Sequence, residues 1–203
     1  MQNAKNNIKA LFLVQCALFA AILCILSPLA IPIGPIPVTL GVFAVMLTGV
    51  VLDWKRACMA VLVYILLGVI GLPVFSGGNS GPGVIAGPTG GYLWAYVPMA
   101  AIIAMVGGAP REREIDEDLR TFVACLLSMI VLYLLGTFQF TLVADSSWSH
   151  ALAVCVYPFV LLDTCKAICA TLLGVRSDGT VVSAHPMASS KEAAANWTGL
   201  RVR

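Results

Sequence analysis

Six long apolar stretches, separated by charged residues or by clusters of glycine and proline, constrain this chain more than any other feature. They cover approximately residues 10–29, 38–52, 57–74, 91–107, 121–143 and 150–174. An α-helix rises about 1.5 Å per residue, so a hydrocarbon core of about 30 Å takes about 20 residues to cross. We expect six transmembrane helices, of which the second and fourth either tilt little or extend into the adjoining loops.

The composition places the chain in the membrane class. Apolar residues make up 60% of the 203 residues, and charged residues only 11%. A soluble domain carries about a quarter charged residues. The first stretch is too long for the apolar core of a secretory signal, and no A-x-A cleavage pattern follows it. We therefore expect an all-α integral membrane bundle that crosses the cell membrane several times.

The basic residues predict the orientation of this bundle. Eleven of the twelve lie outside the spans, and all eleven fall in alternate connections: Lys5, Lys9, Lys55, Arg56, Arg111, Arg113, Arg120, Arg176, Lys191, Arg201 and Arg203. Lys and Arg are retained on the cytoplasmic side, so both termini and the 109–120 loop are expected there. Residues 1–176 then form the membrane domain, and the polar residues 177–203 form a tail that we expect to be mobile.

Several classes of function lack support in the sequence. The net charge is only +2, and no run of basic residues could follow a nucleic-acid backbone. The seven cysteines include no C-x-x-C pair, and His150 and His185 lie far apart, so we predict no metal site. The chain contains neither a G-x-S-x-G nucleophile motif nor a phosphate-binding loop. We predict no catalytic residue, no cofactor and no nucleotide motor within the chain itself.

The sixth span contains the residues with the most chemical potential. Lys166 is the single basic residue inside a span, and Asp163 precedes it by three residues. This spacing places the two side chains about 60° apart on one helix face, where they can pair. An ionised group near the middle of a membrane costs at least about 2.5 to 3.5 kcal/mol, so it calls for a partner or a cavity. Two interpretations remain open: a structural ion pair between helices, or a binding pocket with one acceptor and one cation.

Pro158 predicts a break in the same span. Proline lacks an amide proton and disfavours helical geometry at the preceding Tyr157, so the helix should kink or restart there. Asp163 and Lys166 would then lie on the second part of the helix and face the bundle interior.

Two connections on the outer side are unusually irregular. Residues 31–37 contain three prolines, and residues 76–91 contain seven glycines and two prolines. Such backbone must lie in water or line a protein cavity, because lipid cannot satisfy its polar groups. We expect the second loop to form a lid over a small-molecule pocket, with Asn79 as a hydrogen-bonding group; a plain solvated linker is the alternative. In the first span, Ala17 and Ala21 are one turn apart, which permits close approach of another helix.

Four stretches of the sequence resemble a known family. They are Ile33-Gly34-Pro35-Ile36-Pro37-Val38-Thr39-Leu40, Gly68-Val69-Ile70-Gly71-Leu72-Pro73-Val74-Phe75, Gly87-Pro88-Thr89-Gly90-Gly91-Tyr92, and Pro158-Phe159 followed by Asp163-x-x-Lys166. In these stretches the chain resembles the BioY family, the biotin-binding S components of energy-coupling factor (ECF) vitamin importers. It departs from the family pattern at Gly41, where glutamine is common, and at Leu162, where glycine commonly precedes the aspartate.

The resemblance implies a six-helix bundle that binds biotin near its outer face. It also implies dependence on a transmembrane partner and two ATPases, which agrees with the absence of a nucleotide-binding motif from the chain. By motif position, Asn79 and Asp163 would serve the ureido group, Lys166 would neutralise Asp163 or reach a ligand oxygen, and Tyr92 would wall the pocket. Ala17 and Ala21 match the small-x-x-x-small motif that S components present to their membrane partner.

Two rival functions come from other classes. One is a small intramembrane enzyme that uses Asp163 and Lys166 as acid and base, which would require a nucleophile or metal that the sequence does not offer. The other is a stand-alone ion-coupled carrier in which Asp163 titrates.

Overall fold

The computed structural model describes residues 2–32, 36–107 and 115–176. The tail predicted for residues 177–203 and the first half of the predicted inner loop, residues 109–114, therefore lie outside the described residues. The elements, in chain order, are α1 (Gln2–Leu26), β1 (Ala30–Ile31), β2 (Val38–Thr39), α2 (Gly41–Val51), α3 (Trp54–Val69), the 3₁₀ turn η1 (Ser76–Gly78), α4 (Pro82–Ala86), α5 (Gly90–Ile102), the π-helical turn η2 (Ile103–Gly107), α6 (Ile115–Val143), α7 (Trp148–Cys155) and α8 (Tyr157–Arg176).

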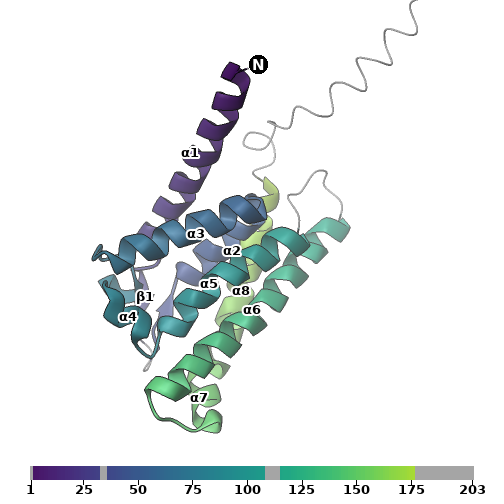
Figure 1. Ribbon diagram of the computed structural model, residues 1–203. Helices are drawn as coiled ribbons and strands as arrows, with labels where there is room; N and C mark the ends of the chain where they lie inside the picture. The colour runs from purple at the N-terminus through teal and green to yellow at the C-terminus, as the bar shows by residue number, and fades with distance from the viewer. Residues whose placement is uncertain (1, 33–35, 108–114, 177–203) are drawn as a thin grey trace, which may run out of the picture.

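The fold is a bundle of helices, as the apolar stretches predict, and each of the six stretches contains a helix (Figure 1). Among the described residues, four helical segments are long and apolar enough to cross a membrane: Lys9–Leu26, Gly90–Gly107, Asp118–Val143 and Trp148–Gly174. The second stretch contains only the 11-residue α2. The described part of the chain is thus mostly helical and contains four candidate membrane spans.

The sixth stretch is interrupted where the sequence predicts. Helix α7 ends at Cys155, Val156 has non-helical backbone angles (φ −122°, ψ −58°), and α8 begins at Tyr157. Pro158 is the second residue of the new helix, where a missing amide proton removes no helical hydrogen bond. The predicted restart of the helix is confirmed.

Glycines bring the two central helices of the bundle close together. Helix α5 packs along α6, and a Cβ atom added to Gly91 would lie 2.4 Å from the carbonyl oxygen of Leu135. A Cβ at Gly136 would lie 2.4 Å from the ring of Tyr92. These distances are shorter than any normal contact, so glycine is required for the observed packing and for the position of the Tyr92 ring.

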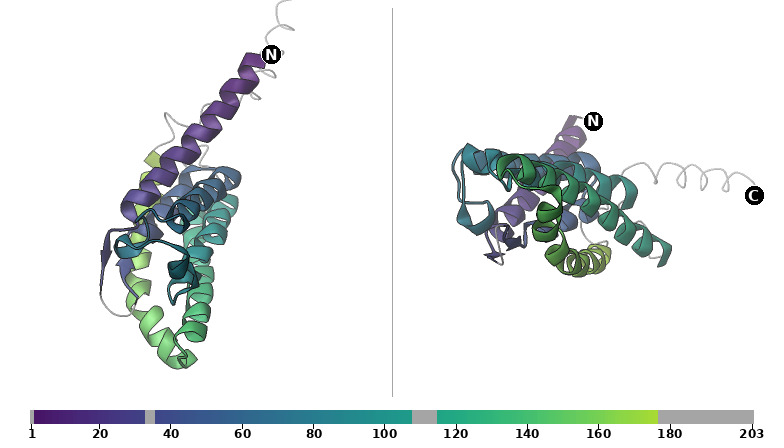
Figure 2. Two further views of the ribbon diagram at one scale, coloured as in Figure 1. Left: turned by 60° about the vertical axis from the view of Figure 1, so that its left-hand side comes forward. Right: turned by 90° about the horizontal axis from the view of Figure 1, so that it is seen from below.

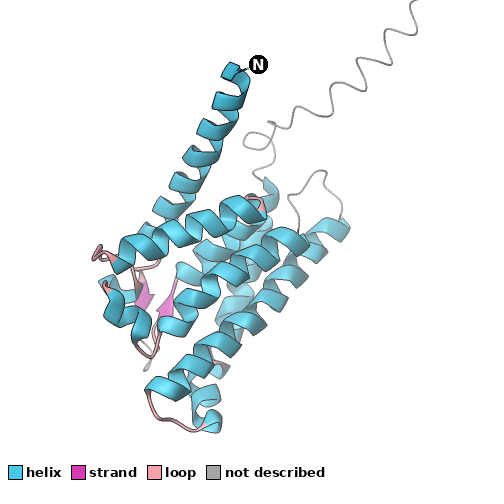
Figure 3. Cartoon of the chain, in the orientation of Figure 1, coloured by secondary structure: helices cyan, strands magenta, loops and turns pink. Residues whose placement is uncertain are grey.

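The irregular connections carry short elements of their own. Strands β1 and β2 form an antiparallel pair in which Ala30 is opposite Thr39 (Figure 3). The glycine-rich loop contains η1 and α4, and the amide of Gly77 donates to the carbonyl of Pro28, which ties the two connections together. The sequence predicted only irregular backbone in both connections. At the other end of the molecule, the N-terminal part of α1 extends beyond the remaining helices (Figure 2).

Candidate ligand-binding site

A cavity of about 250 Å³ lies between the helices and the two irregular connections. Its size suits a small organic molecule. Most of its lining is apolar or aromatic, with a few polar side chains. It is lined by Ser27, Ile36, Pro37, Thr39, Val42, Tyr64, Phe75, Ser76, Asn79, Val84, Thr89, Tyr92, Leu93, Tyr96, Leu132, Tyr133, Cys155, Phe159, Asp163 and Lys166.

All four residues predicted as ligand contacts line this one cavity. Asn79 comes from the glycine-rich loop, Tyr92 from the first turn of α5, and Asp163 and Lys166 from α8. The structure therefore brings together residues that the sequence separates by up to 87 positions (from 79 to 166).

The predicted pair in α8 forms an ion pair. The ammonium group of Lys166 donates to Oδ1 of Asp163 at 2.8 Å, and the side chains are only 13% and 3% exposed. The pairing expected from the three-residue spacing is confirmed. Because both residues line the cavity, their charges face a space that can hold a ligand.

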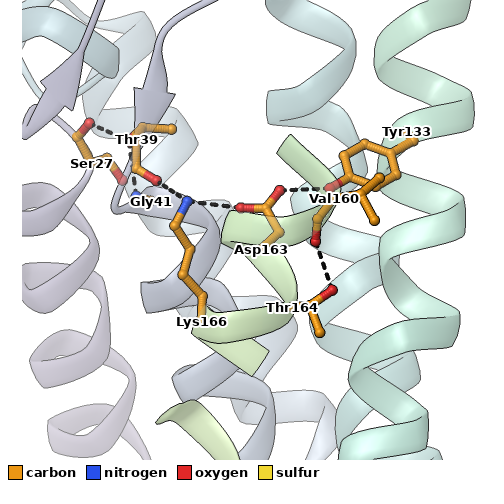
Figure 4. A network of polar contacts seen from close by, with 8 residues as sticks. All are labelled: Ser27, Thr39, Gly41, Tyr133, Val160, Asp163, Thr164 and Lys166. Carbon is orange, nitrogen blue, oxygen red and sulfur yellow. Dashed lines mark hydrogen bonds and ion pairs between the residues drawn. The ribbon is translucent and has the colours of Figure 1, made fainter. Parts of the chain in front are cut away.

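Two residues from other elements complete the surroundings of this pair (Figure 4). The hydroxyl of Tyr133, on α6, donates to Oδ2 of Asp163 at 2.8 Å. The ammonium of Lys166 donates a second hydrogen bond, at 2.9 Å, to the backbone carbonyl of Thr39 at the end of β2. Each carboxylate oxygen thus has one donor and retains capacity for another. The carboxylate is oriented by the protein and can still accept hydrogen bonds from a bound molecule.

The wall of the cavity on the side of α5 is held by hydrogen bonds across the bundle. The hydroxyl of Tyr92 donates to the carbonyl of Cys155 at the end of α7, at 3.2 Å. The side-chain amide of Gln139, on α6, donates to the carbonyls of Ile85 and Gly87, both at 2.8 Å. These bonds secure the segment between α4 and α5 against α6 and place Tyr92 at the cavity wall.

Asn79 is the most exposed of the predicted contacts. Its side-chain nitrogen donates to the carbonyl of Ser76 at 2.8 Å, which holds the side chain within its own loop. The side-chain oxygen of Asn79 remains available as an acceptor at the cavity.

The predicted partner-interface residues lie elsewhere. Ala17 and Ala21 are on an exposed face of α1 and do not line the cavity. The same face carries large apolar side chains, namely Leu13, Val14, Leu18 and Ile25, each between 56% and 68% exposed.

Comparisons with known proteins identify the family of the chain. The BioY family model matches residues 1–181, which is most of the chain. The chain belongs to the BioY family.

Individual BioY relatives cover most of the chain as well. It is 41% identical over 170 residues to biotin transporter BioY2 of Lactococcus lactis subsp. cremoris (strain MG1363), covering 84% of this chain and 91% of the relative. It is 35% identical over 164 residues to biotin transporter BioY of Thermotoga maritima, covering 81% and 94%. A crystal structure of the S component for biotin from an ECF-type ABC transporter superposes with a TM-score of 0.75 at 27% identity, covering 84% of this chain and 92% of that one.

The departure from the BioY pattern at Gly41 has a structural context. A Cβ atom at this position would lie 2.8 Å from Oγ of Ser27 and 2.9 Å from the hydroxyl of Tyr96. Gly41 thus abuts two polar groups of the cavity lining, and a side chain here would displace them. For the second departure, at Leu162, the structure shows an exposed side chain next to the buried Asp163.

Several cavity residues of this BioY protein were not identified from the sequence. Tyr64, Tyr96 and Tyr133 each lie within a predicted span, and each lines the cavity. Tyrosine normally concentrates at the membrane interfaces, where its hydroxyl meets water. A tyrosine deep within a span therefore indicates an internal polar partner or cavity, and this signal was available. Ser27, beside a proline at the end of an apolar stretch, offered no such signal.

Among the residues that the structure describes, no group of three or more His, Cys, Asp or Glu side chains is arranged to hold a metal ion. What the site offers is one oriented carboxylate, one cation, several hydroxyls and apolar walls. This arrangement can bind a small molecule that has an apolar body and a polar head with both donors and acceptors.

Proposed function

We propose that this chain is the substrate-binding S component of an ECF-type importer and that its substrate is biotin. It captures biotin in the cavity near the outer face of the cell membrane. A transmembrane partner and two ATPases then drive delivery to the cytoplasm, so the chain itself acts as a transport subunit and not as an enzyme. The family membership supports this proposal, together with relatives that are themselves named biotin transporters.

The observation that carries the proposal is the buried ion pair at the cavity. Biotin has an apolar bicycle, a ureido head with two N–H donors and one carbonyl acceptor, and a carboxylate tail. Asp163, held by Lys166 and Tyr133, offers a charged acceptor to the ureido N–H groups in a water-poor site. Asn79 supplies a further polar contact to the ureido group, and Tyr92 packs against the bicycle.

The proposal includes six membrane spans with both termini in the cytoplasm. The N-terminus of α1, the start of α6 and the end of α8 lie at one end of the bundle (Figure 1). The basic residues of the sequence cluster in the connections expected at this end. Residues 38–52, which include α2, would form the short second span.

We assign Ala17 and Ala21 to the interface with the transmembrane partner. Both methyl groups are exposed on α1, and small residues permit the close backbone approach that stabilises helix pairs in lipid. The projecting N-terminal part of α1 leaves this helix accessible beyond the bundle (Figure 2).

Two measurements test the proposed function. Isothermal titration of the purified chain with biotin should show saturable binding, and no binding would contradict the proposal. Uptake of labelled biotin should then be compared in cells that express the chain with and without the partner and ATPases. Full uptake without them would favour the ion-coupled carrier, and chemical conversion of biotin by the purified chain would favour an intramembrane enzyme.

A further inference from the structure

Three hydroxyl groups that line the cavity have no hydrogen-bond partner within the described part of the chain. They belong to Ser27, Tyr64 and Ser76. Ser27 and Tyr64 are almost completely buried, with exposures of 1% and 0%. Buried polar side chains in native proteins nearly always have a partner, so each exception calls for an explanation. A ligand in the cavity would supply the missing partner.

The two most buried of these hydroxyls form a local pair. The Ser27 and Tyr64 hydroxyls are close neighbours, but they do not satisfy each other with an acceptable hydrogen bond. Glycine at position 41 leaves the space beside the Ser27 hydroxyl open, since a Cβ there would lie 2.8 Å from the Ser27 oxygen. Both hydroxyls therefore remain free to donate to a molecule in the cavity.

The protein holds both hydroxyls in place without using them. The backbone carbonyl of Ser27 accepts a hydrogen bond from Oγ1 of Thr39 at 2.7 Å. The Tyr64 ring lies edge-on to Phe75, with centroids 5.8 Å apart, and stacks on Tyr96 at 6.4 Å. Two donors fixed in this way are preorganised for an acceptor, because little freedom is lost when the ligand binds.

Ser27 is connected to the Asp163 and Lys166 pair through one residue, and Tyr64 lines the same cavity. The backbone carbonyl of Thr39 accepts from Lys166, and its hydroxyl donates to the backbone carbonyl of Ser27 (Figure 4). A ureido ring presents its carbonyl oxygen between its two N–H groups, so a site for it needs donors and an acceptor within one small region. The cavity has both.

We infer that the hydroxyls of Ser27 and Tyr64 together donate hydrogen bonds to the ureido oxygen of biotin, while Asp163 accepts from a ureido N–H group. This inference rests on the proposed function and deepens it by adding two specificity-determining residues. It explains why two buried hydroxyls remain unsatisfied in a site whose charged residues are already paired. Bound biotin would thus supply the hydrogen-bond acceptor that the two hydroxyls lack in the protein alone.

The variants Ser27→Ala and Tyr64→Phe test this assignment. Each removes one hydroxyl, and each should weaken biotin binding about tenfold by titration calorimetry, as expected for the loss of one buried hydrogen bond. Without ligand, both variants should melt at or above the temperature of the unmodified chain in the same detergent, because removing an unsatisfied buried hydroxyl relieves a desolvation penalty. Ser128→Ala is the matched control: Ser128 is also buried, but its hydroxyl donates to the carbonyl of Cys125 and does not line the cavity.

Two biotin analogues identify the ligand atom that the hydroxyls contact. In biotin amide the carboxylate is blocked and the ureido oxygen is intact, so the tenfold effects of the variants should persist. In 2-iminobiotin an imino nitrogen replaces the ureido oxygen. If the ureido oxygen is the partner, the affinity of each variant for 2-iminobiotin should differ from that of the unmodified chain by less than about twofold.

The outcomes separate this inference from the proposed function. If the unmodified chain binds no biotin, the proposed function fails first. If it binds biotin but both variants bind equally well, the hydroxyls are not ligand contacts and the inference is wrong. The inference is also wrong if the effect of the variants disappears with biotin amide, since the hydroxyls would then contact the carboxylate. A loss of thermal stability without ligand would likewise contradict it, since the role of the hydroxyls would then be structural.

Discussion

Asp163 is placed between two donors of different kinds, a cation and a phenol. Lys166 contacts Oδ1 and Tyr133 contacts Oδ2, both at 2.8 Å. The carboxylate is therefore neutralised and oriented at the same time. In the proposed complex this residue has the largest effect on affinity, because a charged acceptor in a dry pocket forms stronger hydrogen bonds than a neutral one.

We predict that Asp163→Asn weakens biotin binding more than Lys166→Met does. The amide keeps the shape but replaces a charged acceptor by a neutral one, which costs about 2 kcal/mol, or about 30-fold in affinity. It also leaves the Lys166 ammonium buried without its counter-charge. Without Lys166, the carboxyl group keeps the Tyr133 hydrogen bond and can still offer an oxygen, so a loss of about fivefold is expected.

Titration calorimetry of both variants with biotin measures this difference. Asp145→Asn serves as the matched control, since Asp145 is exposed in the turn after α6 and does not line the cavity. Unchanged affinity of Asp163→Asn would remove Asp163 from the binding site. Greater loss in Lys166→Met would indicate that the cation, not the carboxylate, makes the principal ligand contact.

At the scale of elements, the position of α5 depends on its glycine contacts with α6. Gly91 allows the backbone of α5 to lie against the Leu135 carbonyl. This close packing places Tyr92 and Tyr96 of α5 at the cavity. Gln139 adds two hydrogen bonds from α6 to the segment before α5. Helix packing and cavity shape are therefore coupled at this contact.

We predict that Gly91→Ala destabilises the chain and weakens biotin binding together. The added methyl group would meet a backbone carbonyl, which cannot rotate away, and overpacking of this kind costs about 1 to 3 kcal/mol. Gly83→Ala is the control, because a Cβ at Gly83 meets no atom within 4 Å. Thermal unfolding in detergent and biotin titration should both be affected in Gly91→Ala and neither in Gly83→Ala. A stable Gly91→Ala variant with full affinity would show that the two helices separate easily.

The exposed face of α1 has a different role at this scale. We predict that Ala17→Trp and Ala21→Trp abolish biotin uptake in cells with the partner and ATPases, while the isolated chain keeps its affinity. A large side chain would separate the helix backbones at the proposed interface without touching the cavity. Leu134→Trp, on the exposed face of α6, is the control, since α1 packs mainly on α3 and α2. Loss of binding along with uptake would instead place the two alanines inside the bundle.

At the scale of the whole molecule, the proposed topology places the cavity loops outside and the inner connections in the cytoplasm. We predict that a cysteine at Ser80, in the loop of Asn79, reacts with a membrane-impermeant maleimide in intact cells. A cysteine at Lys55, in the first turn of α3, should react only after permeabilisation. All seven native cysteines are unpaired within the structure, so they must first be replaced. The reverse labelling pattern would show that the orientation is opposite to the proposed one.

The sequence by itself determined the features that depend on local periodicity. Apolar stretches bounded by charges and glycines located each of the six helical regions, and Pro158 located the restart at Tyr157. The pair of Asp163 and Lys166 followed from a three-residue spacing, because helix geometry relates such neighbours wherever the helix lies. The short strands β1 and β2 escaped prediction, since two residues carry too little pattern to recognise.

Only the tertiary structure decided which distant groups surround that pair. Tyr133 is 30 residues from Asp163, and Thr39 is 127 residues from Lys166, yet both form hydrogen bonds with them. The unsatisfied hydroxyls of Ser27 and Tyr64 became recognisable only when their burial and their missing partners were known. The physical reason is that the apolar pattern of a helix specifies which of its faces is buried, but not which face of another helix it contacts. That choice depends on packing across the whole bundle, including the glycine contacts of α5 and α6.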